Sequence, residues 1–115
     1  MPGTTDDIEA MTVAFARKQG FAGAISEIVQ KPVVWVLERM DETNGRTRVM
    51  RAFQDRWPDD AALGALKVAQ CLRLSLVARL ARTLARTPEE VRRELTAASH
   101  DTRLRTLFSA DWPAG

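Results

Sequence analysis

Three arginines lie where their spacing would let them act together on an anion. Residues 61–86 contain five basic residues and no acidic residue. At 100° per residue, a helix over this stretch places Arg79, Arg82 and Arg86 on one narrow stripe with Ser75. A row of guanidinium groups can bind phosphates or the carboxylates of a partner. The alternative is a solvated face whose arginines pair with the glutamates of the following helix, at positions 89, 90 and 94.

A second basic cluster lies in the middle of the chain. It consists of Arg46, Arg48, Arg51 and Arg56, and locally only Asp55 offsets its charge. The net charge is only +2, from 17 basic and 15 acidic residues, so acidic residues must gather elsewhere, as they do at positions 6, 7 and 9. A surface with separated charges suits a protein partner as well as a nucleic acid.

The most apolar short segment offers a contact surface of a different kind. Residues 33–37, Val-Val-Trp-Val-Leu, are all apolar, whereas a surface helix needs only about three apolar residues in seven. The surplus must face a second layer of the same domain or another chain. Tryptophans are enriched at interface hot spots. We therefore expect a partner-binding surface formed by Val33, Val34, Trp35, Leu37 and Trp57, with a fully buried helix as the alternative.

The two side chains with nucleophile or base chemistry occur once each. Cys71 lies between Gln70 and Leu72, which is typical of a small buried apolar residue. Ser99-His100-Asp101 resembles the phosphoacceptor box of sensor histidine kinases, although Leu104 and Arg105 stand where that box has threonine and proline. A Cys71–His100 pair is possible in principle, but no spacing supports it. With no phosphate loop, hydrolase or metalloprotease motif, we expect no enzyme, metal or cofactor.

Residues 24–29 and 32–41, with Gly45-Arg46-Thr47-Arg48 after them, resemble the helix-turn-helix and wing of small bacterial regulators. The resemblance implies DNA binding by the second helix. The chain departs from that pattern at Val33, Val34 and Trp35, which stand where polar side chains contact bases.

The elements that must position these residues are all predicted to be helices. Thr87-Pro88-Glu89-Glu90 is a strong helix start, and Asp59 or Asp60 can cap the helix before it. Residues 33–37 have strand propensity, but no second strand candidate exists to satisfy their backbone. The pattern predicts an all-α bundle of five to seven helices around one long central helix over about 60–86. No internal repeat is evident.

The length of 115 residues predicts a single helical domain over 1–115, with short flexible ends at about 1–5 and 110–115. No secretory signal is evident, and charges interrupt the apolar stretch 61–85, so we expect a cytoplasmic protein that does not enter the membrane. The single cysteine excludes an internal disulfide.

These observations favour a small protein–protein interaction module: a regulator, an inhibitor or immunity-type protein, or a small subunit of an assembly. Its partner would be another protein or a second copy of the chain, as a homodimer. The alternative is a nucleic-acid-binding regulator that uses its arginine-rich helix faces.

Overall fold

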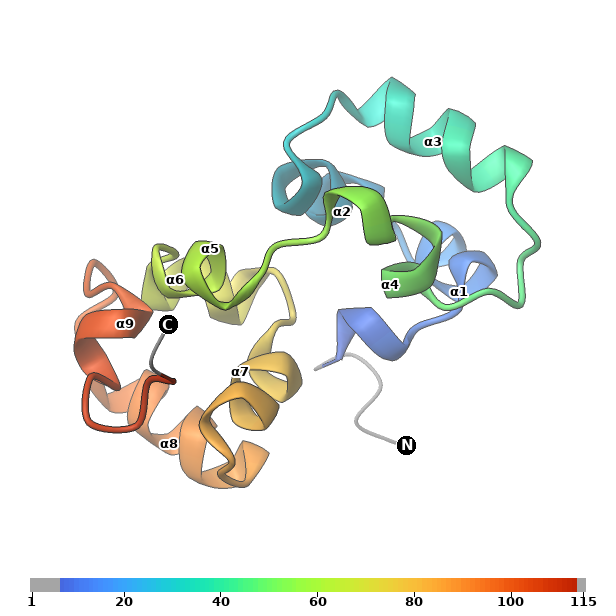
Figure 1. Cartoon of the computed structure of the whole chain (residues 1–115). Coiled ribbons are helices and arrows are strands. Elements are labelled where there is room, and N and C mark those ends of the chain that lie inside the picture. The colour runs from blue at the N-terminus through green and yellow to red at the C-terminus, as the bar shows by residue number, and fades with distance from the viewer. Residues whose placement is uncertain (1–6, 114–115) are drawn as a thin grey trace. The chain divides into compact units, whose positions relative to one another are not determined.

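The computed structural model describes residues 7–113, and its regular elements are all helical (Figure 1). In chain order they are η2 (Ile8–Ala10), α1 (Val13–Lys18), α2 (Ala22–Val29), α3 (Val33–Glu42), α4 (Val49–Ala52), η3 (Gln54–Arg56), α5 (Asp60–Gly64), α6 (Val68–Arg73), α7 (Val77–Leu84), α8 (Pro88–Ala97) and α9 (Leu104–Leu107). The all-α prediction is confirmed for these residues. Of the ends predicted to be flexible, 1–5 and 114–115 lie outside the described residues.

The predicted long central helix is wrong. Residues 60–86 form three helices, α5, α6 and α7, rather than one. Lys67 is extended at the first break, with φ −90° and ψ 161°, and Ser75 is left-handed at the second, with φ 59°. Apolar residues occur on every side of this stretch because the chain changes direction twice and each short helix buries its own side. The same breaks explain why the described residues form more helices than the five to seven predicted.

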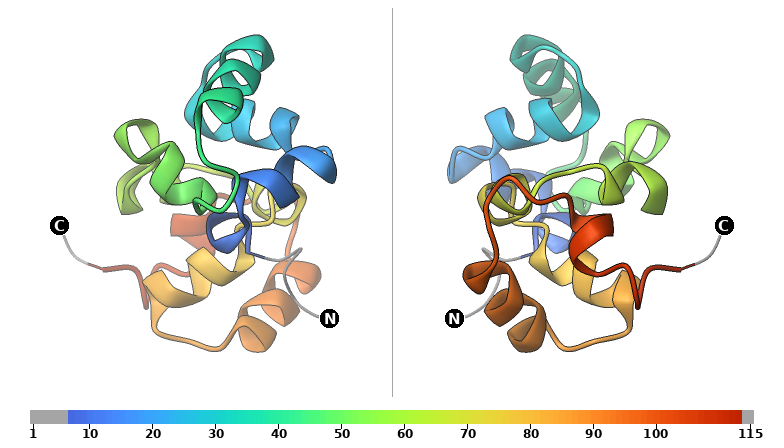
Figure 2. Two further views of the ribbon diagram at one scale, coloured as in Figure 1. Left: turned by 90° about the vertical axis from the view of Figure 1, so that its right-hand side faces the viewer. Right: turned by 90° about the vertical axis from the view of Figure 1, so that its left-hand side faces the viewer.

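The described chain divides into two compact units, one ending at Trp57 and the other beginning at Pro58. In the first unit, α3 packs beside α2, and α1 contacts both α3 and α4 (Figures 1 and 2). An isolated antiparallel bridge joins Thr12, before α1, to Arg48, before α4. The single-domain organisation stays a prediction.

The second unit has a similar order of elements, with α5 in the place of η2 and no described counterpart of η3. Helix α8 packs beside α7, and α9 packs on α5 (Figures 1 and 2). An isolated antiparallel bridge joins Lys67, before α6, to Arg103, before α9.

The two units are copies of one structural repeat, offset by 55 positions. The bridge residues match at this offset (12 and 67, 48 and 103), and so do both ends of four helix pairs. Those pairs are α1 and α6, α2 and α7, α3 and α8, and α4 and α9. The left-handed backbone positions also correspond: Gly20 and Gln30 in the first unit match Ser75 and Ala85 in the second.

Matching backbone hydrogen bonds hold the loops of both units. The amide of Val13 donates to the carbonyl of Thr47 at 2.8 Å, and that of Val68 donates to Thr102 at 2.9 Å. The first amides of α4 and α9 form matching bonds: Val49 donates to the carbonyl of Met11 at 2.8 Å, and Leu104 donates to that of Leu66 at 2.9 Å. Two segments with the same loop geometry, hydrogen bonds and helix bounds have the same fold.

The expectation of no internal repeat is therefore wrong. Only nine pairs at this offset are identical between positions 7 and 58: Ala10/Ala65, Val13/Val68, Ala14/Ala69, Val36/Val91, Thr47/Thr102, Arg48/Arg103, Phe53/Phe108, Trp57/Trp112 and Pro58/Pro113. The core requires only an apolar side chain of suitable size at most buried positions, as at Ile25 and Leu80 or Met40 and Leu95. Such substitutions preserve the fold while erasing the sequence similarity.

Two glycines provide a matched test of this packing. A Cβ at Gly64 would lie 2.9 Å from Cζ2 of Trp112 and 3.1 Å from Cβ of Arg105, whereas a Cβ at Gly23 meets nothing within 4 Å. We expect Gly64→Ala to lower the free energy of unfolding by about 1–3 kcal/mol through overpacking. Gly23→Ala should raise it by about 0.5 kcal/mol, because α2 gains helix propensity. Urea denaturation measures both free energies of unfolding. If the two variants change this free energy by the same amount in the same direction, the packing described here is wrong.

Candidate functional site

The outward face of α3 carries an unusual set of side chains. Val36 and Met40 are buried and hold the helix on its unit. At 100° per residue, the opposite face is a stripe of four exposed residues, hereafter the α3 outer stripe: Val34, Glu38, Asp41 and Glu42. Val34 is 62% exposed, and Val33, beside the stripe, is 44% exposed. These two are, with Met50, the large apolar side chains most exposed in the described part of the chain.

The loop before α3 fixes where its first turn lies. Helix α2 ends at Gln30, which is left-handed with φ 58°. The Ser26 hydroxyl then donates to the carbonyl of Lys31 at 2.5 Å, and the Lys31 amide donates to the carbonyl of Ser26 at 3.1 Å. Pro32 follows as the N-cap residue, with φ −58°. The exposed valines therefore belong to the first turn of a helix that follows a hydrogen-bonded loop.

Trp35, a predicted partner-binding residue, packs against side chains of its own unit. Its ring lies 6.2 Å from that of Phe53, and the Arg39 guanidinium lies 4.4 Å from its centroid. Lys31 places its ammonium group 5.5 Å from the same centroid. Arg39 also donates to Oδ1 of Asp55 at 2.6 Å, and this hydrogen bond lowers the pKa of the Asp55 carboxyl. Trp35 is half-buried, so the valines before it carry the exposed apolar surface.

The equivalent helix of the second unit shows that the fold does not require this surface. At the four positions of the α3 outer stripe, α8 carries Glu89, Arg93, Thr96 and Ala97, all exposed. Glu89 and Arg93 are four residues apart with opposite charges, as is usual on a solvated helix face. The exposed apolar turn is thus a property of α3 alone and not of the repeat.

The other predicted partner-binding residues have different surroundings. Leu37 is half-buried on α3, one turn after Val34, and its carbonyl accepts from Arg17 at 3.4 Å. Trp57 follows η3, and its Nε1–H donates to Oε2 of Glu9 at 2.6 Å. The structure brings Val33, Val34, Trp35 and Leu37 together on one helix. Trp57 is held by η2 instead.

In the arginine stripe predicted for residues 79–86, Arg79 and Arg86 form ion pairs within the second unit. Arg79 donates to the carbonyl of Pro58 at 3.0 Å and pairs with Asp60 at 3.3 Å, leaving its side chain 12% exposed. Arg86 lies beyond the end of α7 and pairs with Glu94 and Asp111. The hydrogen bond that Arg86 donates to the Glu94 carboxylate raises the pKa of Arg86. Arg82 is exposed on α7.

The second basic cluster also splits into different roles. Arg48 donates from Nη1 to the carbonyl of Ala10 at 2.5 Å, and its counterpart Arg103 donates to the carbonyl of Ala65. This contact joins the two ends of each repeat, and it gives Arg48 a structural role. Arg46 and Arg51 are exposed.

The structure differs from the predicted helix-turn-helix and wing in two respects. Helices α2 and α3 follow one another as predicted, but the α3 outer stripe presents a valine and three carboxylates where base contacts would be needed. Within the described residues, the segment after it forms α4 and η3 and not the strands of a wing. Carboxylates repel the phosphate backbone, so this face is unsuited to DNA.

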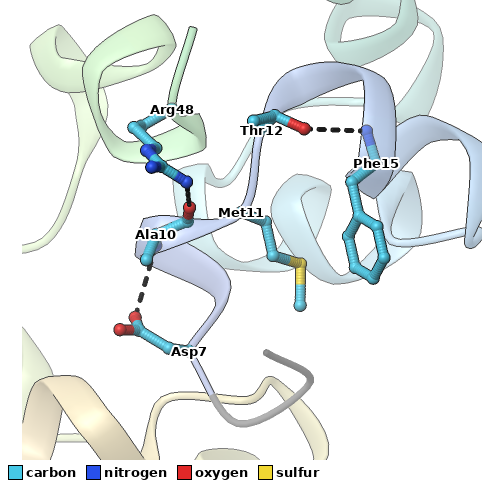
Figure 3. A pocket seen from close by; sticks show the side chains of 6 residues that line it. All are labelled: Asp7, Ala10, Met11, Thr12, Phe15 and Arg48. Atoms are coloured by element: carbon cyan, nitrogen blue, oxygen red, sulfur yellow. Dashed lines mark hydrogen bonds between the residues drawn. The ribbon is translucent and has the colours of Figure 1, made fainter. Parts of the chain in front are cut away.

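One cavity of about 270 Å³ lies in the first unit (Figure 3). It is lined by Asp7, Ala10, Met11, Thr12, Phe15 and Arg48. Figure 3 shows the lining groups bound to one another: the Phe15 amide donates to Oγ1 of Thr12 at 3.1 Å, and Asp7 caps η2. The cavity is smaller than most ligand pockets, and its polar groups already have partners.

Cys71 is buried in α6, and burial raises the pKa of its thiol to about 12 from the ordinary 9.0. The folded chain holds this proton more tightly than the unfolded chain, so the associated stability is complete below pH 9 and is lost as the pH rises towards 12. We expect native protein at pH 8 to resist an aromatic disulfide reagent, and protein in urea to react fully. Fast labelling of the native state would contradict this burial. The counterpart is Ala16, so Cys71→Ala should keep the fold.

No family model matches the chain, and neither a curated protein nor a solved structure matches it. Among residues 7–113, no helix has the length and apolar character needed to cross a membrane. Nowhere in that range do three His, Cys, Asp or Glu side chains gather as a metal site requires.

Proposed function

We propose that this chain is a protein-interaction module whose contact surface is the first turn of α3. The supporting observation is Val34, which is 62% exposed at a position where the second copy of the repeat has Glu89. Val33, 44% exposed, corresponds to Pro88. The same fold therefore forms with glutamate at the position of Val34, which supports a role for this exposed valine outside folding.

The physical properties of this turn suit association. A rigid helix loses little conformational freedom when a partner covers it, so less of the binding energy is lost to ordering. Leu37 extends the apolar surface by one turn, and Trp35 borders it with its half-buried ring. A regulator, an inhibitor or immunity-type protein, and a small assembly subunit all need such a surface.

Nucleic-acid binding is the second candidate, and the exposed arginines favour it. Arg46, Arg51 and Arg82 are exposed. Arg79 and Arg86 pair with carboxylates of their own unit. A gel-shift titration at two salt concentrations tests this candidate, because phosphate contacts weaken linearly in log salt.

The experiment for the interaction module compares Val34→Glu with Glu89→Lys, a charge change at the equivalent position of α8. The parent chain and both variants capture partners from expressing cells, and captured proteins are identified and then purified for titration. A partner that uses α3 should bind Val34→Glu about 30-fold more weakly, as expected for an interface hot spot of about 2 kcal/mol. Glu89→Lys should bind it like the parent chain.

Circular dichroism and urea unfolding show whether each variant is folded. If every identified partner binds folded Val34→Glu as tightly as the parent chain, the α3 surface is not the interface. The mass of the parent chain and of Val34→Glu in solution shows whether a second copy of the chain binds to the α3 surface.

A further inference from the structure

We infer that the partner of α3 is a basic amphipathic helix, with an apolar residue that covers Val34 and lysines or arginines that face Glu38 and Glu42. This inference rests on the proposed function and adds the chemical class of the partner. Its starting point is that the α3 outer stripe is apolar at its first turn and acidic over the rest of its length.

The acidic part of the stripe is poorly compensated within its own unit. Asp41 pairs with Arg17. Glu38 and Glu42 are exposed, and their carboxylates form no ion pair with another described residue. On α8 the equivalent positions carry Arg93 and Ala97. The second unit thus has a balanced face where the first has an excess of negative charge.

The position of these acids along α3 is a second, independent observation. Helix α3 ends at Glu42, so Glu42 lies in its last turn and Glu38 lies near its middle. The C-terminal end of a helix carries partial negative charge, so a carboxylate in the last turn destabilises the helix and a cation there stabilises it. Glu42 therefore does not help α3 fold. A cation from a partner would relieve both the helix dipole and this uncompensated carboxylate.

The spacing of the stripe indicates a helical partner. At 1.5 Å per residue, Glu38 lies about 6 Å and Glu42 about 12 Å along the axis from Val34. A second helix packed along α3 presents side chains at the same intervals, three to four and seven to eight residues apart. The expected motif is an apolar residue with lysine or arginine at those two spacings.

A second copy of this chain does not fit the whole length of the stripe. In a two-fold antiparallel contact that covers all of it, Glu38 faces Glu38 and Val34 faces Glu42. The first contact places like charges together, and the second places a carboxylate against the apolar turn. The charge distribution therefore favours a different, basic chain.

A displayed library of random peptides, screened against the full-length chain, tests the inference. We expect the enriched peptides to share the basic amphipathic motif. One enriched peptide is then synthesised, and its dissociation constant is measured by fluorescence anisotropy. The double variant Glu38→Lys/Glu42→Lys should bind it about tenfold more weakly at low salt, because attraction becomes repulsion at two exposed pairs. The difference should shrink as salt screens these charges.

Two controls make the result specific to α3. Arg93→Glu changes the charge at the α8 counterpart of Glu38 and should leave the dissociation constant unchanged. A peptide with its basic residues replaced by glutamate should recover binding to the double lysine variant. The double lysine variant should also unfold at the same or a higher urea concentration than the parent chain, because the new cations suit the end of α3.

The outcomes separate this inference from the proposed function. Enriched peptides that lose affinity for Val34→Glu but show no preference for basic residues would overturn the basic partner and leave the α3 interface standing. A dimer of the chain that Val34→Glu disrupts would do the same. If no enriched peptide depends on Val34, or if the screen yields none, the basic helical partner is overturned, and the α3 interface is then judged by the binding of captured partners to Val34→Glu.

Discussion

Replacing Phe53 with alanine should lower the free energy of unfolding by about 3–5 kcal/mol. The Phe53 side chain is 0% exposed, and in its unit it packs against Trp35. Its loss removes apolar burial and leaves a cavity that the surrounding helices cannot fill. Because small domains are stable by only about 5–15 kcal/mol, this single change removes a large part of the total.

Phe108 is the matched position in the second unit, at 2% exposure, and Phe108→Ala should cost a similar amount. Urea unfolding followed by tryptophan fluorescence and by circular dichroism measures both variants. Trp35 and Trp57 report on the first unit and Trp112 on the second. A single coincident transition in every variant would support the predicted single domain. A loss below about 1 kcal/mol in either variant would contradict the core described for that unit.

Trp57→Phe is the second change for which a large effect is expected. The Trp57 Nε1–H donates at 2.6 Å to Glu9, whose side chain is 5% exposed. A hydrogen bond to a charged group contributes about 1.5–3 kcal/mol, and phenylalanine removes the donor while keeping most of the apolar contact. We expect a loss of that size in the free energy of unfolding, measured by circular dichroism in urea.

Trp112→Phe provides the control because Trp112 is the repeat counterpart of Trp57. Gly64 stands at the position of Glu9, so no carboxylate faces the indole there. Trp112→Phe therefore reports the cost of the smaller ring alone. The difference between the two variants isolates the Trp57–Glu9 hydrogen bond, and equal losses would show that it adds nothing.

Local sequence signals predicted the helices more accurately than their arrangement. Thr87 caps α8 as expected: its hydroxyl accepts from the Glu90 amide at 3.2 Å. The Glu90 carboxylate accepts from the Thr87 amide at 3.2 Å and from the Thr87 hydroxyl at 3.1 Å, and these two bonds lower the pKa of Glu90. Asp59 caps α5, as one of the two predicted residues, by accepting from the Ala62 amide at 2.9 Å. Such signals act within one helical turn, so no tertiary information is needed to recognise them.

The breaks in residues 60–86 could not be predicted in the same way. Leu74-Ser75-Leu76 contains neither proline nor glycine, yet Ser75 is left-handed with φ 59°. The strain of that backbone is offset by burial of Leu74 and Leu76, at 1% and 0% exposure. Gly20, the counterpart in the first unit, is an ordinary helix stop. The glycine at the matching position of the first unit indicates this break, but the two units share too few identical residues for the repeat to be recognised in the sequence.

For the candidate site, the run of apolar residues at 33–37 was visible in the sequence, and so was its excess over one core stripe. Which of these side chains are exposed depends on the packing of α3, which buries Val36 and exposes Val34. The arginines show the same division: their number is a property of the sequence, whereas the pairing of Arg79 and Arg86 depends on distant carboxylates.

The sequence by itself determined the helical class, the strong caps and the presence of more apolar surface than one core needs. Each of these follows from interactions between residues close together in the chain. Only the tertiary structure decided that the chain folds as two copies of one repeat, and that α3 differs from its counterpart α8 in its exposed face. Contacts such as the bridge between Thr12 and Arg48 connect residues far apart in the chain, and local patterns do not specify them.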